Sequence, residues 1–178
     1  MNETTAETLI LTINALGAGI LLFIAGVVQK IMNEMDEAAF KRFVNALDRT
    51  AMTNPFAVTV ATLPIIAAVL YFPIYGFGHW WFTAGLIAWL IGSAITKVTN
   101  MPVYKWLGNP NNTDPEQLRE KRRTLQLGNT LRAWVTFASV VLMACQFGAR
   151  EVAIVLVVGV VVSFPLLWWA RKYIPNGP

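Results

Sequence analysis

The chain has 178 residues, of which 56% are hydrophobic and only 13% carry a charge. Because soluble domains carry about 25% charged residues, this composition indicates an integral membrane protein and excludes an ordinary soluble domain. The length suits a single domain. The lone cysteine, Cys145, excludes an internal disulfide and a thiolate metal cluster.

Five apolar stretches follow one another along the chain. A membrane-spanning helix needs about 20 apolar residues, with about 17–25 tolerated. The stretches cover about 8–28, 56–77, 80–98, 131–147 and 152–170. Glu3 and Glu7 lead the first stretch, and this acidic start, together with its length, favours a retained helix over a cleaved signal peptide. We therefore expect an all-α, polytopic membrane helix bundle, with a four-helix core and a fifth, C-terminal transmembrane helix.

The distribution of positive charge predicts the topology. Lysine and arginine gather after the first span, between the third and fourth spans, and after the fifth, and only Arg150 lies elsewhere. The positive-inside rule then places the N-terminus outside and the C-terminus in the cytoplasm. This bias, without a cleavable signal, suits a bacterial inner membrane.

The first cytoplasmic connection is expected to be helical. Met35, Ala39, Phe43 and Leu47 recur every four residues, which is typical of an amphipathic helix over about 34–50. Such a helix would lie on the membrane or extend one of the neighbouring spans. Asn54-Pro55 then marks the start of the second span, with proline at a tolerated first-turn position.

The second cytoplasmic connection contains both a stop and a start signal. Pro102 is expected to end the third span near Asn100, because the residue before a proline avoids the helical region. Asp114 and Pro115 then begin a helix. With no strong breaker before Phe147, a cytoplasmic stalk over 115–130 should continue into the fourth span. Its basic run, REKRR, is interpreted as a solvated surface near lipid headgroups, and no nucleic-acid partner is expected.

Four polar residues converge at the cytoplasmic mouths of three predicted spans. They are Asn54, Asn100, Asn129 and Arg132, and the last two share a helix face because they are three residues apart. One interpretation is that Arg132 reaches lipid phosphates while the asparagines cap helix ends. The other is that these side chains face inward and bind a ligand.

No metal or cofactor site is expected from the sequence. His79 is the only histidine, and it lies in the outer turn beside Trp80 and Trp81. It is interpreted as an interfacial residue with no carboxylate nearby, which excludes a standard zinc or iron site. The glycines lack the spacing of a phosphate-binding loop.

Three segments carry a family resemblance. They are FVNALDRTAMTNPF (43–56), TNMPVYKWL (99–107) and LGNTLRAW (127–134). Over roughly residues 10–147, their order and spacing resemble a family of small membrane proteins of largely unknown function that includes the fungal anthrone oxygenases. The chain departs from the family pattern at Tyr104, where asparagine is usual, and at Leu125, where tryptophan is expected. The fifth helix is a further departure.

The resemblance implies a cofactor-independent oxygenase that acts on an aromatic or polyketide-like substrate. Asn54, Asn100, Asn129 and Arg132 would be its site residues, with Arg132 and the amides stabilising a developing oxyanion. A base is also needed, and Asp48 is the carboxylate nearest to this group in sequence. The expected partners of such an enzyme are membrane lipid and a hydrophobic small molecule.

Two other classes remain open. A non-catalytic subunit of a larger membrane complex would use the fifth helix, which is apolar on all sides, against other subunits or further copies of the chain. A transporter is disfavoured, because no ionisable side chain lies near the middle of a predicted span.

Overall fold

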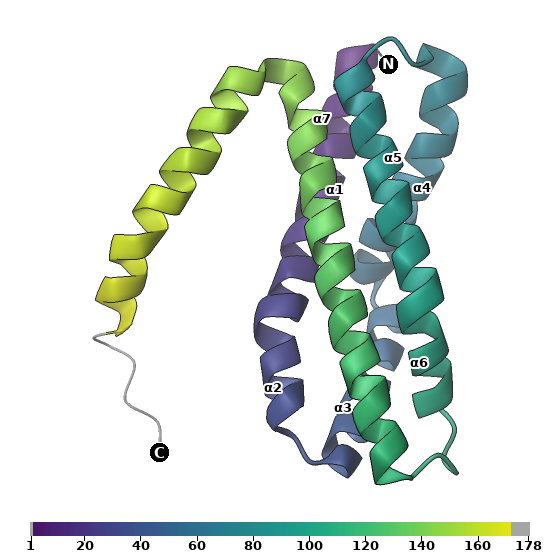
Figure 1. Ribbon diagram of the computed structural model, residues 1–178. Helices are drawn as coiled ribbons and strands as arrows, with labels where there is room; N and C mark the ends of the chain where they lie inside the picture. Colours follow the sequence, from purple (N-terminus) through teal and green to yellow (C-terminus); the bar gives the residue numbers. More distant parts are fainter. Residues whose placement is uncertain (1, 172–178) are drawn as a thin grey trace.

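The computed structural model describes residues 2–171, and the elements of this part are all helical (Figure 1). In chain order they are α1 (Glu3–Phe23), the π-helical turn η1 (Ile24–Val28), α2 (Gln29–Glu34), α3 (Glu37–Thr53), α4 (Pro55–Tyr75), α5 (Trp80–Ile95), the π-helical turn η2 (Thr96–Asn100), α6 (Met101–Leu107) and α7 (Pro115–Arg171). The prediction of an all-α helix bundle is confirmed.

Four helical runs are long and apolar enough to cross a membrane: Glu3–Glu34, Pro55–Tyr75, Trp80–Leu107 and Pro115–Arg171. Large apolar side chains on these runs point outward, such as Ile66 on α4 and Ile91 on α5, which are both about half exposed. In a lipid environment such surfaces are favourable, and helices satisfy their own backbone hydrogen bonds. The chain therefore has the build of an integral membrane protein.

The fourth and fifth predicted spans both lie in α7, which bends at Gly148. Beyond the bend the helix runs back along the length of the bundle and leans away from it (Figure 1). Its apolar side chains are exposed, for example Val155 at 69% and Phe164 at 68%. The predicted count of five spans stays a prediction, because the structure contains no membrane to define where each crossing ends.

The expectation that Pro102 ends the third span is wrong. The helix passes from α5 through η2 into α6 and ends only at Leu107, with Pro102 in the first turn of α6. In the π turn the Met101 N–H donates to the Thr96 carbonyl, five residues back. Because this wider turn has already replaced the usual i to i−4 pattern, the missing N–H of proline removes less than it would in a regular helix.

The predicted amphipathic helix is present as α3, but it packs on protein. Phe40 and Val44 are fully enclosed against α6 and α7, whereas Leu47, from the predicted apolar stripe, is 37% exposed. The buried face is therefore displaced from the one that the four-residue spacing indicated. The reason is that α3 contacts α6 and the stalk of α7, so tertiary packing sets its orientation.

Two apolar clusters form the core, one at each end of the bundle. The cluster at the N-terminal end joins α1, α4, α5 and α7 and contains Ile10, Ala68, Tyr71, Phe82, Leu86, Trp89 and Met143. The cluster at the other end joins α2, α3, α6 and α7 and contains Met32, Phe40, Val44, Val103, Leu107, Leu118 and Leu125. Both clusters include residues of α7, which runs the full length of the bundle (Figure 1).

Glycines allow α5 and its extension to approach α7 closely. A Cβ at Gly85 would lie 2.8 Å from the backbone oxygen of Ser139, and closer still to the Met143 side chain. A Cβ at Gly128 would lie 2.5 Å from the Thr99 hydroxyl oxygen. Small residues at helix contacts are the usual basis of close packing in membranes.

Replacing Gly85 by alanine should destabilise the bundle, because the backbone of α7 cannot move away from the added methyl group without opening the contact. We expect a loss of about 1–3 kcal/mol, as for other overpacked cores, measured by reversible unfolding in detergent. Gly19→Ala is the matched control, because a Cβ there meets nothing within 4 Å. Equal stability of the two variants would contradict the close contact.

The pair formed by Glu37 of α3 and Arg119 of the stalk predicts a pH effect. The Glu37 carboxylate lies 2.7 Å from the Arg119 Nε, and this hydrogen bond lowers the pKa of Glu37. A lowered pKa means that the pair stabilises the fold above pH 4.5 and that this contribution is lost as the pH falls below it. Glu37→Gln should therefore be less stable than the wild type at pH 7 and nearly equal to it at pH 3, as followed by unfolding at both pH values. Glu34→Gln is the control, and a difference that persists at pH 3 would count against the ion pair.

Candidate functional site

The structure brings two of the predicted site residues together in a buried chain of amides. Asn100 of η2 donates from Nδ2 to Oδ1 of Asn129 on α7, at 2.8 Å. Asn129 in turn donates to Oε1 of Gln29 on α2, at 2.9 Å. All three side chains are at most 2% exposed. We call Gln29, Asn100 and Asn129 the amide network; it joins three segments that are far apart in the sequence.

Both π turns adjoin the amide network. Gln29 follows η1 directly, and Asn100 is the last residue of η2. Thr99 donates its hydroxyl to Oδ1 of Asn100 at 2.6 Å, and Gly128 leaves the space that this oxygen fills. Wide π turns in helices are frequently found at functional sites. Two of them beside one polar cluster therefore make the amide network a candidate functional site.

Arg132 lies one helical turn beyond Asn129 and is only 9% exposed. Its Nε atom is enclosed and has no hydrogen-bond partner, and the side chain forms no ion pair with any residue in the described range 2–171. A buried guanidinium without a counter-ion is costly. That Arg132 reaches lipid phosphates and that it faces a ligand both stay predictions.

Asn54 lies apart from the amide network. Its side-chain oxygen accepts the Ala57 N–H at 3.0 Å and so caps the start of α4, and the residue is exposed. This is the capping role that Asn54-Pro55 indicates. Of the four predicted site residues, the structure therefore groups Asn100, Asn129 and Arg132, and gives Asn54 a local structural role.

Two of the surface hollows formed by the described residues lie away from the amide network. One, of about 570 Å³, lies along the second half of α7 and is lined by apolar residues including Val155, Val158 and Val162. The other, of about 430 Å³, lies between α3 and the start of α7 around Lys41 and Thr113. Neither supplies a ready-made entrance to Arg132.

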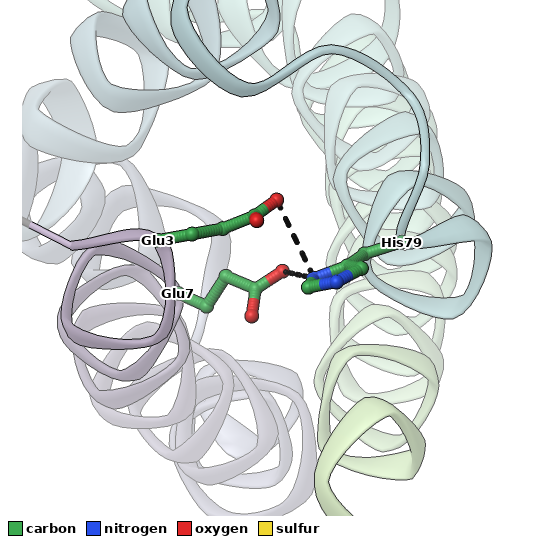
Figure 2. Close-up of side chains that lie close together, drawn as sticks. All are labelled: Glu3, Glu7 and His79. Carbon is green, nitrogen blue, oxygen red and sulfur yellow. Dashed lines mark hydrogen bonds and ion pairs between the residues drawn. The ribbon is translucent and has the colours of Figure 1, made fainter.

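A second polar cluster, at the N-terminal end of the bundle, was missed by the sequence analysis. Glu3 and Glu7 lie one turn apart on α1 and both point toward His79, which precedes α5 (Figure 2). The Glu7 Oε1 lies 2.8 Å from the His79 Nδ1, and the Glu3 Oε1 lies 3.5 Å from the same nitrogen. Tyr71 of α4 donates its hydroxyl to Glu7 at 2.7 Å.

The expectation that His79 has no carboxylate nearby is wrong. Glu7 is 1% exposed, and its hydrogen bond raises the pKa of His79. The error arose because Glu3 and Glu7 were interpreted as part of a tail before the first span, whereas α1 already begins at Glu3 and packs against α4. The contact joins residues more than 70 positions apart, so no local spacing reveals it.

The amide network and this acidic cluster lie at different levels of the bundle. The continuous helical run from Glu7 to Gln29 is about 33 Å long at about 1.5 Å per residue. Groups in one cluster therefore cannot act directly on a ligand in the other. The two clusters are separate sites in chemical terms.

Comparisons of the chain with known protein families, with curated proteins and with solved structures gave no match. The resemblance to the family of the anthrone oxygenases therefore stays a prediction, and a function has to be inferred from the geometry of the two polar clusters.

The amide network makes a direct prediction. Asn129→Ala would leave the Asn100 donor and the Gln29 acceptor buried without partners, and each such orphaned group costs about 1–3 kcal/mol. We expect a clear loss of thermal stability in detergent. Thr130→Ala, at an exposed neighbouring position whose hydroxyl bonds only to the Gln126 carbonyl, should change little. Comparable melting temperatures for both variants would show that the amide network does not hold the helices together.

Proposed function

We propose that this chain is a small membrane enzyme that binds a hydrophobic, ionisable molecule beside Arg132. The observation that carries the proposal is the enclosed Nε of Arg132, which has no hydrogen-bond partner, on a residue that forms no ion pair within residues 2–171, next to an amide network whose members satisfy one another. An anionic ligand would neutralise the charge that these residues leave unpaired. The reaction proposed is the cofactor-independent oxygenation of an aromatic or polyketide-like substrate.

The chemistry is that of a carbon acid. A CH₂ group beside aromatic rings and a carbonyl loses a proton to give an enolate, and Arg132 would stabilise the negative oxygen of that enolate. Molecular oxygen then oxidises the carbanion, so that CH₂ becomes C=O and one molecule of O₂ yields the new carbonyl oxygen and one water. Glu7 and His79 are too far from Arg132 to act as the base, so the proton of the substrate CH₂ group goes to water. Arg132 acts by lowering the pKa of that CH₂ group.

The proposal includes the orientation of the chain. Within residues 2–171, all lysines and arginines except Arg150 and Arg171 lie in α2, α3, η2, α6 and the first part of α7 up to Arg132, and Arg171 is the last residue of α7. The positive-inside rule would make the side that carries these segments cytoplasmic. Arg132 and the amide network would then be in the cytoplasmic half of a cell membrane, such as the inner membrane of a bacterium, and the acidic cluster would be outside.

A second candidate function is that of a non-catalytic subunit of a membrane complex. The observation that favours it is the second half of α7, whose apolar residues are exposed on every side and lean away from the bundle (Figure 1). Lipid would cover this surface, and so would a helix of another subunit or of a further copy. In this case Arg132 would pair with a group from the partner.

Mass spectrometry of the intact chain, purified in mild detergent, tests the binding step. We expect a bound hydrophobic small molecule that is lost in Arg132→Gln and retained in Arg150→Gln, an exposed arginine at the other end. Stoichiometric partner proteins and no small molecule would instead identify a subunit. A small molecule bound equally by both variants would remove Arg132 from the site.

Oxygen consumption with anthrone as the probe substrate tests the reaction. The wild type should accelerate O₂ uptake over the protein-free rate, and Arg132→Gln should lower this acceleration by about 10²–10³-fold, the usual effect of removing one oxyanion-stabilising group. Arg150→Gln should keep the wild-type rate. If the folded wild type does not accelerate O₂ uptake, the oxygenase hypothesis is rejected for this substrate class.

A further inference from the structure

We propose that Glu3, Glu7 and His79 form a binding site for a divalent transition-metal ion. The site is separate from the amide network and does not depend on the function proposed for Arg132. Each of the three residues offers one ligand atom, and these atoms all lie within 4.8 Å of one another. Figure 2 shows the two carboxylates and the imidazole turned toward one common point between α1 and the residue that precedes α5.

The spacing of the ligand atoms fits a single ion. With metal–ligand bonds of about 2.1 Å, neighbouring ligands in octahedral or tetrahedral geometry are about 3.0–3.4 Å apart. The His79 Nδ1 lies 2.8 Å from the Glu7 oxygen and 3.5 Å from the Glu3 oxygen. The two carboxylate oxygens lie within 4.8 Å of each other, so rotation of the partly exposed Glu3 side chain would bring the three atoms around one metal ion.

The types of ligand define the class of metal. Two carboxylate oxygens and one imidazole nitrogen suit borderline ions such as Zn²⁺, Mn²⁺ and Fe²⁺, and the absence of a thiolate disfavours soft ions. Three protein ligands leave at least one position for water or a substrate, as in catalytic metal sites. The Tyr71 hydroxyl lies 2.7 Å from Glu7 and 3.2 Å from Glu3.

The charge of the cluster is the second argument. Two carboxylates face one histidine, and within residues 2–171 neither carboxylate pairs with a lysine or an arginine. Glu7 is 1% exposed, so water does not take the place of a counter-ion beside it. A divalent cation bound between the two carboxylates would supply the positive partner that lysine and arginine do not supply there.

The side chains are held in place before any ion binds. Glu3 and Glu7 share one face of α1 because they are four residues apart. The Tyr71 hydroxyl donates to Glu7 at 2.7 Å and lies 3.2 Å from Glu3, and its ring packs against Phe82 at a centroid distance of 5.1 Å, within the apolar cluster of α4 and α5. Such outer contacts fix ligand orientation and strengthen metal binding. An ion here would tie the start of α1 to the segment before α5.

Calorimetric titration with zinc chloride is the test. The full chain, prepared without a histidine tag, is purified in detergent, treated with a chelator and freed of it. We expect one Zn²⁺ per chain, and a rise in Tm because the ion binds only the folded state. Replacement of Zn²⁺ by Co²⁺ should give the visible absorption bands of a cobalt ion bound to nitrogen and oxygen.

Matched variants locate the site. Glu7→Gln and His79→Gln each keep a polar side chain of similar size, and each should weaken Zn²⁺ binding by about 100-fold or more, since even loss of an outer contact costs about 10–100-fold. Glu151→Gln, an exposed carboxylate near the bend of α7 at the same end of the bundle, should bind Zn²⁺ like the wild type.

Two results would overturn the proposal. One is the lack of saturable binding by the folded wild type, which would make the cluster a hydrogen-bonded ion pair only. The other is equal Zn²⁺ affinity of the wild type and the His79→Gln variant. Should Glu7→Gln fail to fold, Glu3→Gln decides in its place, because the Glu3 side chain is 34% exposed and its loss disturbs the core less.

Discussion

The close approach of α7 to the helix formed by α5, η2 and α6 is the constraint on which the rest of the structure depends. Gly85, Gly92 and Gly128 open the space for it at three levels. At Gly92 the neighbour is the Thr136 hydroxyl oxygen, and at Gly128 it is the Asn100 amide oxygen. Since lipid offers no hydrophobic force to drive helices together, such fitted contacts and the hydrogen bonds between them hold a membrane bundle.

This contact also bears on where the polar groups lie. Between the acidic cluster and the amide network, α7 presents small or weakly polar buried side chains, including Ser139 and Thr136, and α1 presents Asn14, which bonds to the sulfur of Met143. Arg132 lies at the edge of this stretch nearest the amide network, and from Thr136 to Met143 α7 carries no charged side chain. Apolar and weakly polar side chains thus separate the charged groups of the two clusters, which is the arrangement that the cost of charge in a membrane favours.

Much of the fold could be predicted from the sequence, because composition and apolar length determine membrane helices directly. Local sequence signals were also reliable where a feature depends on residues within one helical turn. An example is the start of α4, which Asn54 caps. That Asn100 and Asn129 lie at one level was expected, but whether they cap helix ends or face inward was left open. Prediction failed where the deciding contact is distant in sequence or the helix is irregular. His79 meets Glu7 across 72 positions, and Gln29 faces inward only after a π turn that no apolar periodicity shows.

The two π turns have a consequence for how this protein relates to simpler bundles. A π turn is equivalent to one extra residue inserted in an α-helix, and one residue rotates everything beyond it by about 100° around the helix axis. Gln29 and Asn100 are the residues at which these rotations end. The same chain with one residue fewer in each π turn would direct these amides away from Asn129 and toward lipid. The extra residue in each π turn therefore rotates Gln29 and Asn100 toward Asn129 instead of toward lipid. A related protein with regular helices here would need different side chains at these positions.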